Sequence, residues 1–262
     1  MDLYTASALG IEELVKIIIK RNSASVLQPN DKGWTPLMYA CIYCQEKIVA
    51  LFVNLVPFCV YSINKEKQTP LMLSTKSGNL NITKMLLKPE ILECKDKRGW
   101  TALFYAVHFG HLDIIYYLLK NKANMNTRDY ESYTVLMVAV QGGREDVVAL
   151  LLTFGVHFKL LKNFQITKAI HLARKWKRLK LIILLSMISV TDLDTLLKNL
   201  NLDAYSEFFK ENNIDVSAFL KLNEHDLKLL GISKIGPRKI MALAITKYKY
   251  LIDLKNQLEN DI

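Results

Sequence analysis

The chain has 262 residues, of which 51% are hydrophobic and 23% charged, and it carries a formal net charge of +10. This balance supplies a buried core and argues against a disordered or collagen-like chain. The chain contains four cysteines, which do not indicate a disulfide scaffold, and no apolar run approaches the ~18 residues of a membrane span. Its start shows no signal-peptide pattern, so we expect a soluble protein of a reducing compartment.

Related phrases recur along the first half of the chain, each built on a threonine. The threonines are Thr35, Thr69, Thr101 and Thr134, spaced by 34, 32 and 33 residues, and the same step outward reaches Met1 and Thr167. The residue nine positions after each anchor is usually glycine; these residues are Gly10, Cys44, Gly78, Gly110, Gly143 and Trp176. One structural unit therefore occurs about six times in the sequence.

The residues of the unit predict where its helices begin and end. Threonine before Pro-Leu predicts a helix N-cap, with Pro36 or Pro70 in the first turn, where a missing N–H costs nothing. Glycine nine residues later ends that helix, because it enters the left-handed conformation cheaply. A second helix with an apolar pair follows, and polar turn residues precede each threonine. One such unit cannot bury its own apolar face, so the units must stack.

A period near 33 residues with a turn, two helices and a Thr-Pro-Leu start resembles the ankyrin repeat. Five copies cover residues 2–155, and a degenerate sixth over 165–190 is expected to cap the stack. Where the family has histidine after Thr-Pro-Leu, this chain has an apolar residue, so we expect apolar packing there; the residues are Met38, Met72, Phe104 and Met137. We expect an all-α ankyrin-repeat solenoid over residues 1–190.

Residues 191–262 do not continue the period and read as short helices followed by one long helix. Asn223 and Asp226 have the spacing of a capping box, and Gly236-Pro237 opens the last helix. Phrases in the order Phe208-Phe209, Phe219–Ile232 and Gly236-Pro237 resemble a sterile alpha motif (SAM) domain. The resemblance implies a five-helix SAM domain over 191–262.

The two parts together resemble the ankyrin repeat and sterile alpha motif domain-containing protein 3 family, although the long linker of vertebrate members is missing. The resemblance implies a non-enzymatic scaffold or adaptor with a cytoplasmic, ciliary setting. The partners it implies are SAM-domain proteins including further copies of this chain, another ankyrin–SAM protein, a bicaudal C-like RNA-binding protein and NIMA-related kinases. A germline family with a leucine zipper fits less well, because Leu251, Leu254 and Leu258 make too short a zipper.

Charge in the second domain is unevenly placed. Residues 191–226 hold eight acidic residues against three lysines, whereas 227–252 hold six basic residues and no acid. We predict an acidic mid-loop surface of Asp215, Glu224 and Asp226 that meets a basic end-helix surface of a second copy; the basic residues are Lys234, Ile235, Gly236, Arg238 and Lys239. Such a head-to-tail contact does not close and builds a filament. The alternative is that these are solvated faces with ordinary helix starts. Cations in a first helical turn, as at Arg238, point to a partner anion.

A basic run without any acid lies in the degenerate sixth repeat; its residues are Lys159, Lys162, Lys168, Arg174, Lys175, Lys177, Arg178 and Lys180. A terminal repeat needs a polar outer face, which is the simpler explanation. The alternative is direct binding of RNA or an anionic membrane. The run lacks the interleaved exposed aromatics expected of a single-strand binder.

Three aromatic residues, Trp34, Trp100 and Tyr133, stand just before the repeat threonine. We predict that they form a partner surface of the ankyrin stack, with packing against the adjacent turn as the alternative. Cys41 and Cys44 have zinc-like spacing but no second ligand pair, and the five histidines form no ligand set. No catalytic motif occurs, so we expect no enzyme, no metal and no cofactor.

Overall fold

A computed structural model describes residues 1–157, 163–188 and 192–260. These ranges contain eighteen α-helices and three short 3-10 helices, and no strand beyond an isolated bridge between Arg128 and Thr134. The chain divides into two compact units, Met1–Val135 and Leu136–Ile262. The predicted all-α class is confirmed. The predicted domain boundary at 190/191 lies outside the described residues.

The first unit is a stack of helix pairs. Its elements are α1 (Leu3–Leu9), α2 (Glu12–Arg21), η1 (Ser23–Val26), α3 (Pro36–Ile42), α4 (Glu46–Leu55), η2 (Pro57–Tyr61), α5 (Pro70–Ser77), α6 (Leu80–Leu86), α7 (Pro89–Leu92), α8 (Ala102–Phe109) and α9 (Leu112–Lys120). The first helices α1, α3, α5 and α8 pack on one another in order, as do the second helices α2, α4, α6 and α9. Each pair thereby buries the apolar face that it could not bury alone.

The helix ends follow the predicted caps. The side chains of Thr35 and Thr69 accept hydrogen bonds from the backbone N–H three residues on, and Pro36 and Pro70 occupy the first turn. The residue nine positions after the anchor is left-handed in the first five repeats. This position is strained for Cys44, which has φ of 57°.

In the sixth repeat the expected register is wrong by one residue. The left-handed residue is Lys177, with φ of 53°, and not Trp176. The next residue, Arg178, lies against Gly143 of the preceding repeat, just as His111 lies against Gly78. The sixth unit therefore stacks as a repeat although its leading motif is lost.

The second unit continues the helix pairs and adds the C-terminal domain. After α10 (Val135–Gly142) its elements are α11 (Glu145–His157), α12 (Asn163–Lys175), α13 (Leu179–Ile188), α14 (Leu193–Asn199), η3 (Asp203–Tyr205), α15 (Ser206–Glu211), α16 (Val216–Phe219), α17 (Glu224–Leu229) and α18 (Ile235–Asn260). Phe209, Phe219, Leu227 and Met241 are buried among the last five helices.

The long helix α18 also packs against α11 and α13 of the repeats. Lys247 of α18 lies 2.8 Å from a carboxylate oxygen of Glu145, whose other oxygen is 3.4 Å from Lys180. Burial alone would raise the pKa of Glu145, but the two lysines bring it below its usual value. Leu251 is buried one turn further along α18. The C-terminal domain and the last repeats therefore share one packed structure.

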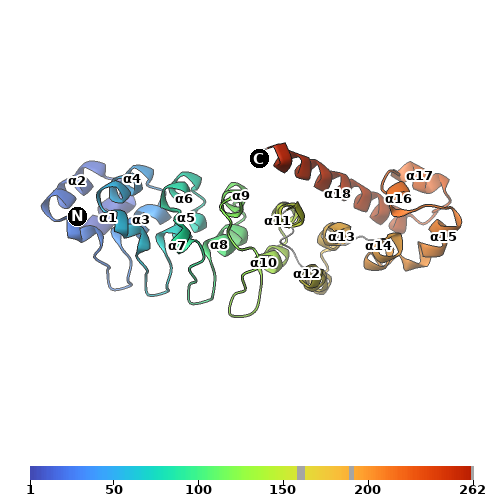
Figure 1. Cartoon of the computed structure of the whole chain (residues 1–262), viewed down its shortest axis with the longest axis horizontal. Helices are drawn as coiled ribbons and strands as arrows, with labels where there is room; N and C mark the ends of the chain where they lie inside the picture. The colour runs from blue at the N-terminus through green and yellow to red at the C-terminus, as the bar shows by residue number, and fades with distance from the viewer. Residues whose placement is uncertain (158–162, 189–191, 261–262) are drawn as a thin grey trace. The chain divides into compact units, whose positions relative to one another are not determined.

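The turns between helix pairs of the first unit project on the same side (Figure 1). Each turn is held by one side-chain oxygen, because Oδ1 of its asparagine or aspartate accepts hydrogen bonds from the backbone N–H groups two and four residues on, at 2.8–3.0 Å. The four residues are Asn30, Asn64, Asp96 and Asp129. This is the Asx-turn chemistry expected from the polar turn sequences.

Neighbouring turns are joined by backbone hydrogen bonds. Lys65 N–H donates to the carbonyl of Lys32, Lys97 to that of Glu66, and Tyr130 to that of Arg98, at 3.0–3.3 Å. The close approach leaves no room for a side chain at the left-handed residue of two turns. A Cβ on Gly33 would lie 2.7 Å from the nitrogen of Lys65, and one on Gly99 2.8 Å from that of Tyr130.

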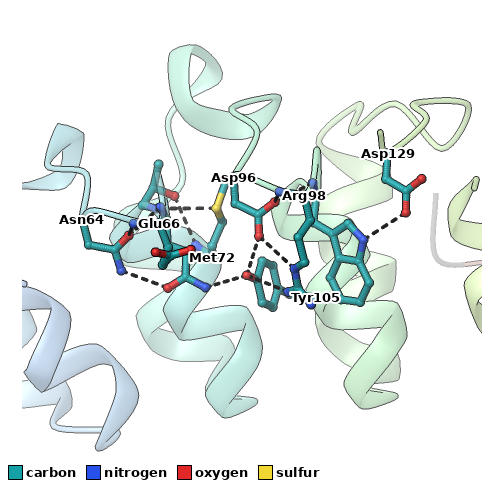
Figure 2. A network of polar contacts seen from close by, with 10 residues as sticks. Asn64, Glu66, Met72, Asp96, Arg98, Tyr105 and Asp129 are labelled. Carbon is teal, nitrogen blue, oxygen red and sulfur yellow. Dashed lines mark hydrogen bonds and ion pairs between the residues drawn. The ribbon is translucent and has the colours of Figure 1, made fainter. Parts of the chain in front are cut away.

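Asp96 carries the densest polar network of the stack (Figure 2). Beyond its two backbone bonds, its Oδ2 accepts from the hydroxyl of Tyr105 at 2.8 Å and lies 3.5 Å from the guanidinium of Arg98. Gln68 of the preceding repeat donates to the same Tyr105 hydroxyl at 2.6 Å. Burial, followed by this bond to Asp96, raises the pKa of Tyr105. The network thus links two repeats through buried polar groups.

We predict that Gly99→Ala lowers the free energy of unfolding by about 1–3 kcal/mol, because alanine is strained at φ of +82° and meets the next turn. Lys67 holds the equivalent position with φ of 58°, so Lys67→Gly is the matched control. It should leave stability unchanged or raise it by up to about 1 kcal/mol. Urea unfolding measures both, and an equal effect of the two substitutions would contradict the strained-turn account.

We predict that Asp96→Ala costs about 2–4 kcal/mol, because it strands two backbone donors, the Tyr105 hydroxyl and a guanidinium. Asp96→Asn should cost clearly less, since asparagine fulfils the turn role at Asn30 and Asn64. Urea unfolding compares the two variants. Equal stability of the alanine and asparagine variants would show that the turn does not depend on this side chain.

Candidate interaction surfaces

The three aromatic residues predicted as an ankyrin partner surface are all half-buried. The ring of Trp34 lies 5.3 Å from that of Tyr39, measured between centroids. The indole N–H of Trp100 donates to Asp129 of the next turn at 3.1 Å, and Tyr133 ends the turn that Asp129 holds. Trp100 therefore contacts the adjacent turn, as the alternative from the sequence describes, whereas Trp34 packs on α3 of its own repeat. Their role toward a partner stays a prediction.

Arg98 is a residue that sequence reasoning missed. Its guanidinium carbon lies 4.0 Å from the centroid of the Trp100 ring, and its Nη2 donates to the hydroxyl of Tyr105 at 3.1 Å. Partial burial would lower the pKa of Arg98, but Tyr105 and Asp96 raise it, so the group is a permanent cation. A signal was present in Arg98-Gly99-Trp100, since arginine is the cation that stacks best on indole.

The predicted basic end-helix surface is largely open. Lys234, Ile235, Gly236 and Lys239 are exposed at the start of α18, with Ile235 61% exposed. A Cβ on Gly236 would meet no atom within 4 Å. These four residues lie together in sequence and offer two cations around one apolar side chain.

Arg238 differs from the other members of this predicted surface. Its side chain is only 13% exposed, and its Nε lies 3.4 Å from a carboxylate oxygen of Glu224 in the same domain. It also donates to the carbonyls of Ile232 and Ser233. The anion that its place in a first turn suggested is therefore internal. The prediction that Arg238 and Glu224 belong to two separate surfaces is wrong.

The predicted acidic mid-loop residues are engaged in helix starts. Asp215 caps α16 by accepting from the backbone N–H of Ala218 at 2.7 Å. Asp226 accepts from the backbone N–H of Asn223 at 2.9 Å, which confirms the predicted capping box of α17. Asp215 and Asp226 are near Glu224 in sequence, but each of these three side chains has its own partner.

A second acidic group was missed. Asp203, Glu207 and Glu211 recur every four residues through η3 and α15, and all three are exposed. Glu207 and Glu211 are four residues apart on α15, a spacing visible in the sequence that places them on one face of that helix. Glu211, the last residue of α15, precedes Asp215 by four residues in sequence, and both are exposed.

Some basic residues of the sixth repeat bind groups within the chain. Lys159 and Lys162 lie outside the described residues. Arg174 donates to the carbonyl of Asn199, Arg178 to that of Gln141, and Lys180 pairs with Glu145. Lys168, Lys175 and Lys177 are exposed. Trp176, between the last two, is 51% exposed, so the expectation that this run lacks an exposed aromatic is wrong.

The four cysteines differ in exposure, since Cys44 is exposed and Cys94 is half-buried. Cys41 and Cys59 are buried, and burial raises the pKa of the Cys59 thiol to about 12 and that of Cys41 well above its usual value. These thiols are weak nucleophiles. Over the described ranges, no three side chains of His, Cys, Asp or Glu gather as a metal site would require. In the same ranges no helix combines the length and apolar character of a membrane span.

Comparison with known proteins supports both predicted modules. A family model of ankyrin repeats matches in three overlapping copies, over residues 3–93, 50–129 and 88–162. A model of the SAM domain (sterile alpha motif) matches residues 186–249. Ankyrin repeats and SAM domains are protein-interaction modules and are typically non-catalytic.

Individual relatives match only in part. Protein bicaudal C homolog 1-A of Xenopus laevis is 44% identical over 57 residues, which are 22% of this chain and 6% of that protein. Rabankyrin-5 of Mus musculus is 27% identical over 157 residues, 58% of this chain and 13% of that protein. The ankyrin repeat and KH domain-containing protein mask-1 of Caenorhabditis elegans is 38% identical over 163 residues, 60% and 6% respectively.

The chain thus spans a small fraction of each of these relatives, so their activities as whole proteins do not transfer to it. What the matches share with the structure is the stacked repeats and the SAM domain that follows them. The chain belongs to the ankyrin-repeat proteins and carries a SAM domain after its repeats.

Proposed function

We propose that this chain is a scaffold or adaptor in which the ankyrin stack holds protein partners and the SAM domain joins copies of itself or related SAM domains. The observation that carries the proposal is the open basic surface Lys234–Ile235–Gly236 with Lys239, in a domain that also exposes Asp215 and Glu211. Surfaces of opposite charge on one domain favour a head-to-tail contact, and such a contact propagates.

The ion pair of Arg238 and Glu224 within one domain reduces the number of residues that we assign to the contact between domains. Those two charges already satisfy each other at 3.4 Å, so we assign the association to Lys234 and Lys239 around Ile235 on one side and to Asp215 and Glu211 on the other. Multivalency along the resulting assembly would raise the avidity of whatever the ankyrin part holds.

The proposed partners follow from resemblance. The family with the same domain order suggests another ankyrin–SAM protein, a bicaudal C-like RNA-binding protein and NIMA-related kinases, in the cytoplasm at the cilium. The 44% identity to a bicaudal C homolog over 57 residues supports a related SAM domain as the heterotypic partner.

A second candidate function is direct binding of single-stranded RNA by the sixth repeat. The exposed indole of Trp176 between Lys175 and Lys177 favours it, because a base can stack on the ring while the lysines meet the phosphates.

We predict that the full chain associates in a salt-sensitive manner and that Lys234→Glu/Lys239→Glu makes it monomeric. Glu211→Lys/Asp215→Asn should also give monomers, since asparagine keeps the α16 cap and lysine suits the end of α15. Sedimentation velocity on each variant and on their equimolar mixture measures this. Each variant keeps one surface intact, so the mixture should stop at a dimer.

Two outcomes would contradict the head-to-tail proposal. One is a wild-type chain that stays monomeric at every concentration and salt. The other is association that both double variants leave unchanged, which would assign self-association to a different surface. Arg238→Glu is unsuitable as the test, because it also breaks the internal pair with Glu224.

For the second candidate, we predict that the chain binds oligouridine at low salt and that Trp176→Ala weakens binding by about 5- to 100-fold, the range of one lost stacking contact. Trp176→Phe is the matched control and should retain most of the affinity. Fluorescence anisotropy of labelled RNA measures both. Absence of binding at low salt, or binding to anionic vesicles alone, would rule out the RNA function.

A further inference from the structure

A pocket of about 490 Å³ opens between α1 and α3 at the N-terminal end of the repeats. Its lining combines three tyrosine rings with one carboxylate, a carboxamide and an aliphatic side chain; the residues are Asp2, Tyr4, Leu9, Asn30, Tyr39 and Tyr43. No described lining residue is basic. Three electron-rich rings and one anion in a single pocket favour a cationic ligand.

Two of the tyrosines are held in place by their hydroxyl groups. Tyr4 donates to the carbonyl of Gln28 at 3.1 Å, and the Asn30 side chain donates to the hydroxyl of Tyr39 at 2.9 Å. The rings of Tyr4 and Tyr39 lie 6.0 Å apart between centroids, at 67°. The polar ends of these side chains are therefore engaged, and both side chains line the pocket. Tyr43, which also lines the pocket, is 58% exposed.

The carboxylate of Asp2 is ionised at neutral pH. Its Oδ1 accepts from the backbone N–H of Thr5 at 2.7 Å, and this bond lowers the pKa of Asp2. A charged carboxylate at the rim of a partly enclosed pocket attracts a cation and repels phosphate or carboxylate ligands.

The fourth repeat holds a cation next to the counterparts of two pocket residues, Tyr39 and Asn30. Trp100, Tyr105 and Asp96 stand at the repeat positions that Trp34, Tyr39 and Asn30 occupy in the second repeat. There the guanidinium of Arg98 lies 4.0 Å from the centroid of Trp100 and 5.6 Å from that of Tyr105.

The second repeat lacks this internal cation. The counterpart of Arg98 is Lys32, which is exposed and makes no cation–π contact within the described part of the chain. Trp34, the counterpart of the Trp100 ring on which Arg98 stacks, does not line the pocket, so the parallel with the fourth repeat extends to Tyr39 and Asn30 alone.

We propose that this pocket binds an arginine side chain of a partner protein. The guanidinium stacks against the tyrosine rings and pairs with Asp2, which suits its planar, forked geometry better than that of a lysine ammonium. The inference rests on the proposal that the ankyrin stack binds proteins, and it names the chemistry of the partner's anchor residue.

The test uses NMR of the full chain with labelled tyrosine rings. The probe is N-acetyl-arginine N-methylamide, and the control is its citrulline counterpart, which has the same shape without charge. The arginine probe should shift the ring signals of Tyr4, Tyr39 and Tyr43 saturably, while the citrulline probe should not. Equal shifts with both probes, or no saturable shift with arginine, would overturn the proposal.

Variants locate the site. Asp2→Asn keeps the cap of α1, because asparagine is an equally good N-cap, but removes the charge; it should weaken arginine binding by about threefold or more. Tyr43→Ala should have a similar effect, and Tyr43→Phe should bind like wild type. Unchanged affinity in both Asp2→Asn and Tyr43→Ala would contradict the assignment.

Sedimentation of the same Asp2→Asn chain separates this inference from the proposed assembly. The pocket lies in the first unit and the SAM surfaces in the second. Loss of arginine binding with intact self-association is the expected result. A pocket that fails to bind arginine in a chain that still assembles overturns the arginine site alone.

Discussion

The repeats of the first unit depend on one side-chain oxygen in each turn. Oδ1 of Asn30, Asn64, Asp96 or Asp129 accepts two backbone N–H groups and so fixes the turn in a single shape. Only a turn of that shape presents its carbonyl to the N–H of the next turn. Because neighbouring turns are held at this spacing, the helices behind them stack in register and bury their apolar faces. The two glycines that face a neighbouring backbone follow from the same close approach.

The second unit depends on a different interaction, the packing of α18 against the repeats of that unit. A SAM domain can be connected to a repeat stack by a flexible linker alone. In this chain α18 packs on α11 and α13, and Lys247 pairs with Glu145. The residues 250–260 that α18 adds beyond the matched SAM segment include the buried Leu251. This packing explains why the chain needs little linker. It also leaves the start of α18, with Lys234 and Lys239, free for association.

Features set by local chemistry were predictable from the sequence. The threonine caps, the proline at the first helical position, the left-handed glycines and the capping box of Asn223 and Asp226 all depend on residues within a few positions of one another. The stack itself was predictable because its period repeats. The number of repeats and the five-helix end domain follow from these local rules and from resemblance.

Features set by tertiary contact were not predictable. Arg238 and Glu224 are fourteen residues apart in sequence, and only the fold brings them together, so counting charge placed them on opposite surfaces. Lys177, and not Trp176, takes the left-handed position at the end of α12, and Trp176 is 51% exposed. The placement of Arg98 over Trp100 likewise depends on the turn geometry.

The proposed assembly through the SAM domain can be measured on the wild-type full chain by light scattering coupled to size exclusion, over a range of loading concentrations. If the chain assembles, its mass should rise above 30.1 kDa with concentration and fall back toward that value at high salt, as charged surfaces are screened. A constant mass of one chain under all conditions would contradict the proposed assembly.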